Sequence, residues 1–287
     1  MAGQTQLTLI DSPPRRQFLK WVGNKQRFAA EIVAAMPARF DRYVEPFVGS
    51  GAVLARVGPE DGLAGDALAP LIEIWRLLQT DPETLLSHYT RLYERYGENR
   101  EETYLRVRES YNSSPNGPDL LFLCRTCYGG VVRFTRAGKI STPIGAHRAI
   151  SPQSLDERMR EWRPRVMQTR FVTASFEETM AEAREGDVVY CDPPYAYSQQ
   201  ILYGSQSFDL KELWQAIGRC ASVGAKVLLS LDGRKKSGSV ELRFQIPDGL
   251  FRRQLFLDCG SSMLRRFQKS GETMQDEIVH DRLLLTW

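Results

Sequence analysis

The sequence lacks the features of secreted and membrane proteins. It has only five cysteines in 287 residues, an odd number scattered along the chain. This number excludes a complete disulfide framework and favours a reducing compartment. No apolar run reaches the roughly 20 residues that cross a bilayer. Residues 1–17 lack the charged start, apolar middle and small-residue cleavage site of a signal peptide. We therefore expect a cytoplasmic protein with no membrane partner.

The sequence also lacks the common motifs for metals and for phosphates. Cys124 and Cys127 form a lone CxxC pair, so we expect two reduced thiols and no metal site. The glycines at 49 and 51 do not fit the pattern GxGxxG, and no GK[ST] is present. These absences argue against zinc and against a bound nucleotide phosphate.

Charge is unevenly distributed along an otherwise ordinary globular composition. Hydrophobic residues make up 42% of the chain and charged residues 25%. The net charge is +3, yet residues 121–170 hold ten Lys or Arg and three acids, a local charge of +7. This segment either contacts a polyanion such as a nucleic acid or forms solvated helix faces, and charge alone does not decide between them.

The first 79 residues alternate short strands with helices. Apolar spacing predicts helices over 26–36 and 68–79 and short strands over 42–45 and 63–66. This βαβα order is typical of a parallel sheet covered by helices. No internal repeat interrupts it.

The pattern changes between residues 80 and 165. A polar, aromatic, helical stretch is followed by an apolar helix and then by a Gly-rich hairpin or loop over 128–147. Further strands are predicted later in the chain, the last two as an antiparallel edge: 170–173, 187–191, 225–231, 249–257 and 282–287. The predicted fold class is α/β, with residues 1–78 and 166–287 forming the sheet domain and 79–165 forming a mainly helical insertion.

A ligand site is predicted where the first two strands end. The stretch EPFVGSGAV (45–53) joins a strand end, a tight Gly-Ser-Gly turn and a helix start, although such a glycine pair is often only a turn. Asp66 ends the next strand, where an acid either accepts hydrogen bonds from ribose hydroxyls or caps a helix. Together they indicate an adenosine-like ligand without a pyrophosphate.

The stretch FLKWVGNK (18–25) precedes the first strand and adds two candidates. Trp21 offers a flat π face beside which a sulfonium cation is stabilised, and Lys25 offers a partner for a carboxylate. The alternative for each residue is ordinary, because a tryptophan packs well in a core and a lysine is usually solvated.

The sharpest motif is YCDPPY (190–195), at the end of a predicted strand. The two prolines end the strand in a stiff turn directly after Asp192. An exocyclic amine of a nucleic-acid base is a poor nucleophile, because its lone pair is delocalised into the ring. Asp192 and the Pro193 carbonyl can each accept one N–H and so localise that lone pair, while Tyr195 stacks on the base. A base in a duplex must be flipped out to reach such a pocket.

These motifs, in this order and spacing, resemble the Dam-type (D12 class, alpha-group) DNA adenine-N6 methyltransferases. The resemblance is close over residues 16–78 and 170–196 and looser over 125–147. It implies a Rossmann-like S-adenosylmethionine-dependent methyltransferase sheet, a target-recognition insertion and catalysis by Asp192, Pro193, Pro194 and Tyr195. It also implies S-adenosylmethionine contacts at Trp21, Lys25, Glu45, Pro46, Phe47, Gly49, Ser50, Gly51, Asp66, Ser175, Phe176 and Asp192.

The insertion resembles the family's DNA-reading stretch, YNGLxRxNxxGxxxxPxG. Arg133 falls on the base-reading arginine, which can bind guanine with two hydrogen bonds in the major groove. Gly129 departs from the pattern, which has Asn there, so we do not predict GATC as the recognition sequence. The DNA-binding residues implied by the resemblance, phosphate contacts among them, are Arg125, Tyr128, Arg133, Arg136, Lys139, Pro143, His147 and Arg148.

The expected function is methyl transfer from S-adenosylmethionine to N6 of a flipped-out adenine at a specific site in duplex DNA. RNA adenine, cytosine N4 and a protein amide nitrogen are alternative substrates, and a catalytically inactive DNA-binding protein is an alternative of another class. Asp192 and the basic insertion favour DNA adenine. The resemblance implies a bacterial or phage protein at the nucleoid, a monomer or weak dimer, and leaves a companion restriction endonuclease open.

Overall fold

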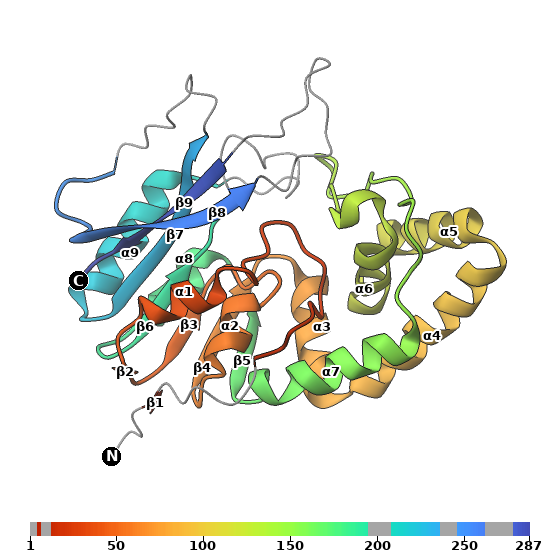
Figure 1. Cartoon of the computed structure of the whole chain (residues 1–287), viewed down its shortest axis with the longest axis horizontal. Coiled ribbons are helices and arrows are strands. Elements are labelled where there is room, and N and C mark those ends of the chain that lie inside the picture. Colours follow the sequence, from red (N-terminus) through yellow and green to blue (C-terminus); the bar gives the residue numbers. More distant parts are fainter. Residues whose placement is uncertain (1–4, 7–12, 195–207, 236–245, 262–277) are drawn as a thin grey trace.

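The computed structural model describes residues 5–6, 13–194, 208–235, 246–261 and 278–287. Its centre is a seven-stranded sheet in the order β5-β4-β3-β6-β7-β9-β8 (Figure 1). The strands are β3 (Tyr43–Glu45), β4 (Gly62–Asp66), β5 (Thr169–Thr173), β6 (Val188–Cys191), β7 (Lys226–Lys235), β8 (Arg253–Ser261) and β9 (Ile278–Leu285).

Five neighbouring strands of the sheet are parallel. Val44 in β3 pairs with Leu63 in β4 on one side and with Val189 in β6 on the other. Chain order therefore reverses between β3 and β6, which is where α/β sheets hold ligands at the carboxyl ends of their strands. The predicted antiparallel edge is confirmed, because β9 pairs antiparallel with both β7 and β8.

Helices cover both faces of the sheet, which explains its continuous apolar strands. Every residue of β3 and β6 is buried. Because neighbouring side chains of a strand point to opposite faces, Tyr43 belongs to one core cluster and Val44 to the other. The first cluster contains α1 (Ala29–Ala34), α2 (Ala52–Val57) and α3 (Ala69–Thr80), and the second contains α8 (Phe176–Ala181) and α9 (Leu210–Ser222).

Four further helices form a separate layer beside the sheet (Figure 1). They are α4 (Pro82–Glu98), α5 (Arg100–Ser113), α6 (Gly117–Thr126) and α7 (Pro152–Val166), with a short 3-10 turn at Tyr128–Gly130. The Asn99 side chain accepts a hydrogen bond from the Glu102 amide, so the long helical stretch divides there into α4 and α5. Among the described helices, none is long and apolar enough to cross a membrane.

The sequence did not predict the short antiparallel pair of β1 (Thr5–Gln6) and β2 (Arg39–Phe40). Two-residue strands leave no periodic pattern, so only the folded chain shows them. The other expected strands and the expected helices at 26–36 and 68–79 are present, with ends shifted by a few residues.

Residues 13–25, which we call the N-terminal strap, lie between the sheet and the layer of helices α4 to α7. The strap has no helix or strand, yet Phe18 and Leu19 are fully buried. The Phe18 ring lies 5.5 Å from that of Trp75 in α3 and 6.2 Å from that of Trp162 in α7. The strap therefore belongs to the core although it has no regular secondary structure.

Gly51 begins α2 with a φ of 63°, and a Cβ at this position would lie 2.9 Å from Trp75. We predict that Gly51→Ala lowers the free energy of unfolding by about 2 kcal/mol, because it adds left-handed strain and a clash with Trp75. Urea unfolding followed by circular dichroism measures this change.

Gly97 in α4 is the matched control, since no atom lies within 4 Å of a Cβ added there. Gly97→Ala should raise the free energy of unfolding by about 0.5 kcal/mol, through higher helix propensity. Equal effects at the two glycines would contradict this account of Gly51.

Candidate active site

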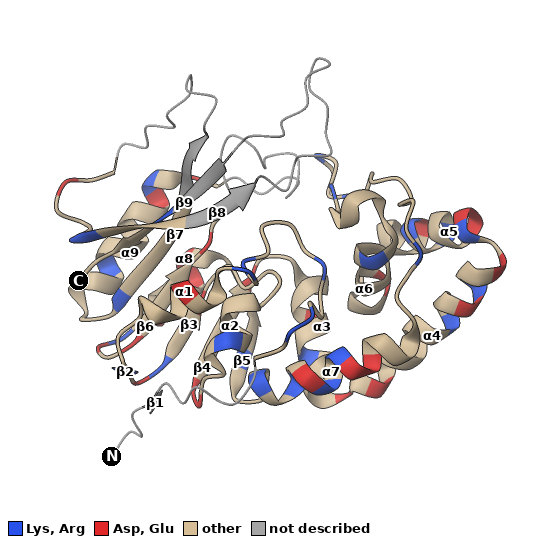
Figure 2. Ribbon diagram, in the orientation of Figure 1, with Lys and Arg blue, Asp and Glu red and all other residues tan. Residues whose placement is uncertain are grey.

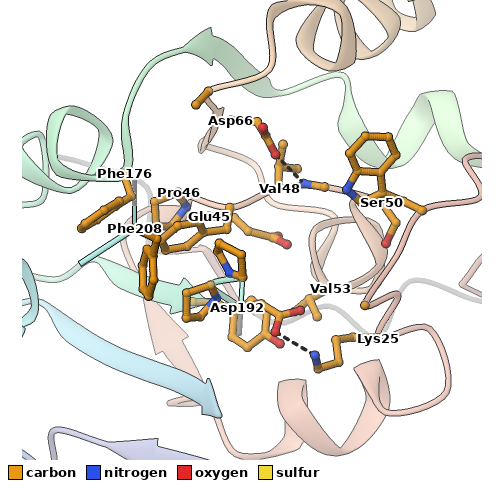
Figure 3. Close-up of a pocket in the computed structure, with 18 of the residues that line it drawn as sticks. Lys25, Glu45, Pro46, Val48, Ser50, Val53, Asp66, Phe176, Asp192 and Phe208 are labelled. Carbon is orange, nitrogen blue, oxygen red and sulfur yellow. Dashed lines mark hydrogen bonds and ion pairs between the residues drawn. The ribbon is translucent and has the colours of Figure 1, made fainter. Parts of the chain in front are cut away.

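A cavity of about 470 Å³ opens at the carboxyl ends of β3, β4 and β6 (Figure 3). Its wall contains segments that are far apart in sequence: the strap, the loop after β3, the end of β4, the start of α8 and the turn after β6. It brings together most of the residues that the sequence singled out, namely Trp21, Lys25, Glu45, Pro46, Phe47, Gly49, Ser50, Asp66, Ser175, Phe176, Asp192, Pro193 and Pro194.

The glycine loop is held by backbone bonds from both sides. The Val48 amide donates to the Gly65 carbonyl at 2.9 Å, and the Gly51 amide donates to the Val48 carbonyl at 2.7 Å. Gly49 has a φ of 43°, and a Cβ there would lie 3.1 Å from the Trp21 ring. The loop therefore needs glycine both for its turn and for close approach to Trp21. Gly51 caps α2 behind the cavity wall.

The Asp66 carboxylate joins the end of β4 to this loop. It accepts hydrogen bonds from the Gly49 amide at 3.3 Å and from the Leu68 amide at 3.0 Å, just before α3. Burial raises the pKa of Asp66 to about 6, although these amides lower it. Asp66 is not the N-cap of α3, which is Leu68, but it holds the Leu68 amide and also lines the cavity.

One end of the cavity is aromatic. The rings of Phe47 and Phe176 are stacked with centroids 5.2 Å apart, and Phe208 lies 6.1 Å from Phe47 and 5.7 Å from Phe176. Ser175 starts α8 through a capping box, in which it exchanges hydrogen bonds with Glu178. This end of the cavity suits a flat apolar ring such as a purine.

The opposite end contains an ion pair. Lys25 Nζ lies 2.7 Å from Asp192 Oδ1, and both side chains are largely buried (Figure 3). The lysine predicted to bind a ligand carboxylate thus contacts the carboxylate of the predicted catalytic motif. Trp21 is buried, as a core residue is, and it also lines the cavity.

Glu45 is a second buried carboxyl group at the cavity wall. The Tyr43 hydroxyl donates a hydrogen bond to Glu45 Oε2 at 2.7 Å. Burial raises the pKa of Glu45 to about 8, against the lowering effect of that bond, and the Asp192 charge raises it further. The neutral form of Glu45 therefore predominates at pH 7.

The charge of the lining favours a cationic ligand. Among the described lining residues, Lys25 is the only cation, whereas four acids line the cavity besides the neutral Glu45, namely Asp66, Glu177, Asp192 and Glu212. A ligand with an aromatic base, ribose hydroxyls and a positive sulfonium matches this combination of groups. The lining therefore fits S-adenosylmethionine.

The turn after β6 places its motif at the cavity. Cys191 is the last residue of the strand, Pro193 is buried, and Asp192 and Pro194 are half-buried. Tyr195 lies outside the described residues. The prolines end β6 as predicted, so the Asp192 side chain lies at the edge of the sheet.

The expected DNA-binding residues lie on α6 and on the segment 128–148 that follows it. Seven of them are exposed: Tyr128, Arg133, Arg136, Lys139, Pro143, His147 and Arg148. Figure 2 shows the basic residues along this segment. Two hydrogen bonds of the Arg133 backbone stabilise the segment. The Arg133 amide donates to Thr142 Oγ1 at 2.7 Å, and the Arg133 carbonyl accepts from the Ser141 amide at 3.0 Å.

Arg125 differs from these seven residues, because its side chain is directed to the strap. Its guanidinium is largely withdrawn from solvent and donates to the Gln17 and Phe18 carbonyls of the strap. Burial lowers the pKa of Arg125 to about 10, and the nearby Arg158 lowers it further. A guanidinium held in this way does not present its N–H groups to a DNA backbone.

The sequence analysis missed several lining residues. Phe208 directly precedes α9, Glu212 lies in its first turn, and Val53 and Tyr190 come from inside α2 and β6. The Tyr190 hydroxyl lies 2.9 Å from Ser230 Oγ, which ties β6 to β7. Val53 and Tyr190 stand within the stretches EPFVGSGAV and YCDPPY but were not predicted as lining residues, whereas no motif quoted above includes Phe208 or Glu212.

Comparisons with known proteins place the chain in a family. The D12 class N6 adenine-specific DNA methyltransferase family matches residues 21–240. The Retron Ec67 DNA adenine methylase of Escherichia coli is 34% identical over 220 residues, covering 74% of this chain and 75% of that protein. The type II methyltransferase M1.LlaDCHI of Lactococcus lactis subsp. cremoris is 27% identical over 233 residues, covering 75% and 80%.

A third relative is much longer than this chain. The DNA N-6-adenine-methyltransferase of Escherichia phage P1 is 29% identical over 249 residues, which cover 83% of this chain but 32% of the phage protein. The family match spans most of the present chain and includes every strand end that lines the cavity. The chain therefore belongs to the D12 class of N6 adenine-specific DNA methyltransferases and is an adenine-specific DNA methyltransferase dependent on S-adenosylmethionine.

Proposed function

We propose that the enzyme methylates N6 of an adenine flipped out of duplex DNA at a specific site. The observation that carries this proposal is the placement of Asp192 and the Pro193-Pro194 turn at one cavity, paired with Lys25. An adenine inside a duplex cannot reach a carboxylate in a cavity wall, so the base must leave the stack.

Asp192 and the Pro193 carbonyl are the proposed acceptors for the two N–H groups of the target amine. Holding both hydrogens directs the nitrogen lone pair toward the transferred methyl, and positioning of this kind is the main requirement of such a transfer. When bound, S-adenosylmethionine supplies an activated methyl on its sulfonium. The amine nitrogen gains that methyl and loses one proton, which we assign to water.

Lys25 is proposed to orient Asp192 rather than to bind a ligand carboxylate. The 2.7 Å ion pair fixes the position of Asp192 Oδ1. A carboxylate held in one orientation presents its oxygens to an amine without a further cost of ordering. The pair thus supports the role of Asp192 as the acceptor.

The cofactor is proposed to lie along the cavity from the aromatic end to Lys25. Phe47, Phe176 and Phe208 suit the adenine ring, Asp66 suits the ribose hydroxyls, and Trp21 suits the sulfonium. Glu45, Pro46, Gly49, Ser50, Gly51 and Ser175 complete the proposed set around the loop and the α8 start.

DNA reading is assigned to the helical insertion, residues 79–165, with the methyltransferase domain formed by 1–78 and 166–287. The exposed basic segment 128–148 supports this assignment. Arg133 is proposed to read a base, and Arg136, Lys139 and Arg148 to contact phosphates. The similarity to type II methyltransferases supports a companion restriction endonuclease, whereas the adenine methylases support a solitary enzyme in a bacterium or phage.

Methylation should depend on Asp192. Because Asp192→Ala would leave the buried Lys25 ammonium without this partner, Asp192→Asn is the cleaner variant, and we expect it to lower kcat by at least about 100-fold. Modification-sensitive sequencing of DNA from a methylation-free host should find N6-methyladenine at one short motif with the wild type and none with Asp192→Asn.

Glu60→Gln serves as the control, since this exposed carboxylate precedes β4, at the ends of the strands that lie away from the cavity. It should methylate as the wild type does. A host genome left unmodified by soluble wild-type protein would contradict the proposed substrate, and full activity of Asp192→Asn would contradict the role of its carboxylate.

Cofactor affinity should fall in mild acid because of Asp66. Its pKa of about 6 means that the carboxylate is largely ionised at pH 7 and largely protonated at pH 5. A protonated acid is a weaker acceptor for ribose hydroxyls, so the Kd for S-adenosylmethionine should rise about tenfold from pH 7 to pH 5. Glu45 stays neutral throughout this range.

Calorimetric titrations of the cofactor at several pH values measure this change. Asp66→Asn should bind weakly at pH 7 and lose most of the pH dependence. A wild-type Kd that stays constant between pH 5 and pH 7 would disprove the ribose assignment.

Loss of a base contact and loss of a phosphate contact should have different effects on DNA binding in two variants. Arg133→Ala should reduce discrimination at one base pair about tenfold or more, since it removes a base contact. Lys139→Ala should weaken binding to all sequences and reduce the slope of log K against log salt by about 0.9. Fluorescence anisotropy with cognate and altered duplexes at several salt concentrations distinguishes these outcomes, and identical behaviour of the two variants would refute the distinction.

A further inference from the structure

The backbone of the N-terminal strap is held by side chains of the helical layer. Its carbonyls have no sheet or helix partners, and buried carbonyls require them. Three consecutive carbonyls find donors on α6 and α7. The Arg16 carbonyl accepts from Trp162 Nε1 at 2.8 Å, and the Gln17 carbonyl accepts from Arg158 Nη1 at 2.8 Å.

Arg125, in the last turn of α6, completes this arrangement. Its Nη2 donates to both the Gln17 and Phe18 carbonyls, so the Gln17 carbonyl receives two guanidiniums. A planar guanidinium presents its donors in a rigid fork, which suits two carbonyls in succession. At the surface, Arg16 adds ion pairs to Glu157 and Glu161 of α7, both at 2.9 Å.

The next residues of the same strap reach both functional regions. The Lys20 side chain lies against Gly130, where an added Cβ would collide with it, so the strap touches the turn that begins the basic segment. Trp21 lies against Gly49, and Lys25 pairs with Asp192. From Phe18 to Trp21 is three residues, a reach of about 10 Å at most. A displacement of the Phe18 backbone would therefore also displace Trp21.

We propose that Arg125 is a positioning residue for the cofactor cavity. It fixes the strap against α6 and thereby holds Trp21 and Lys25 in place, which joins the DNA-reading segment to the cavity through a few residues of backbone. The proposal rests on the cofactor assignment above. It assigns Arg125 no phosphate contact.

A positioning role and a phosphate contact predict different effects on cofactor affinity and on the salt dependence of DNA binding. Arg125→Gln removes the donor to the carbonyl of the buried Phe18 and one of the two donors to the Gln17 carbonyl, and the Kd for S-adenosylmethionine without DNA should rise about tenfold. The slope of DNA affinity against salt should stay at its wild-type value. Arg125→Lys should recover part of the cofactor affinity, because an ammonium can donate to both carbonyls.

Calorimetric titration of S-adenosylmethionine into the full chain separates positioning from simple unfolding. Irreversibly unfolded protein lowers the number of binding sites, and reversible unfolding raises the apparent Kd only by the reciprocal of the folded fraction, which circular dichroism measures. A displaced strap raises the Kd beyond that factor. Arg160→Gln is the matched control, since Arg160 lies on α7, is exposed and pairs only with Asp156 among the ion pairs of the described residues. It should change neither quantity.

The outcomes are distinct. A raised Kd with an unchanged salt slope supports the proposal. An unchanged Kd with a salt slope reduced by about 0.9 overturns it and makes Arg125 a phosphate contact. If Arg125→Gln does not fold, Arg158→Gln removes only one donor and should raise the Kd about threefold, and no rise overturns the proposal. Failure of the wild type to bind the cofactor would instead refute the cofactor assignment itself.

Discussion

The ion pair between Lys25 and Asp192 joins two segments that lie 167 residues apart in the chain. Both side chains are largely buried, and a buried charge without a partner is costly. The pair holds the strap against the end of β6, and the two segments together supply the wall of the cavity at this end.

The parallel sheet determines where that meeting takes place. Because β3 lies between β4 and β6, the ends of all three strands meet at one edge, and the carboxyl groups of Glu45, Asp66 and Asp192 lie there together. Their environments differ. Glu45 and Asp66 have raised pKa values from burial, whereas Asp192 has the Lys25 ammonium beside it. The carboxyl ends of these strands thus bring together three carboxyl groups in different environments, of which Asp192 is the ion-paired one.

The helical layer holds the strap in place. Arg125 and Trp162 bind the strap through its carbonyls, so the helices and the cavity share a structural element. The packing of Phe18 between Trp75 and Trp162 ties the same strap to α3 and α7. A segment without regular secondary structure is thereby as firmly placed as a strand, because its polar groups and its apolar side chains both have partners.

The sequence by itself determined the parallel sheet, the strand-end acids and the turn after β6, because period, glycine and proline act locally. Tertiary structure alone decided what those residues contact. Phe208 reaches the cavity only because α9 packs beside α8, and Lys25 meets Asp192 only after the chain closes over the sheet. Arg125 carries the same charge whether it faces DNA or a carbonyl. Burial and hydrogen-bond partners distinguish these roles, and both depend on residues far away in the sequence.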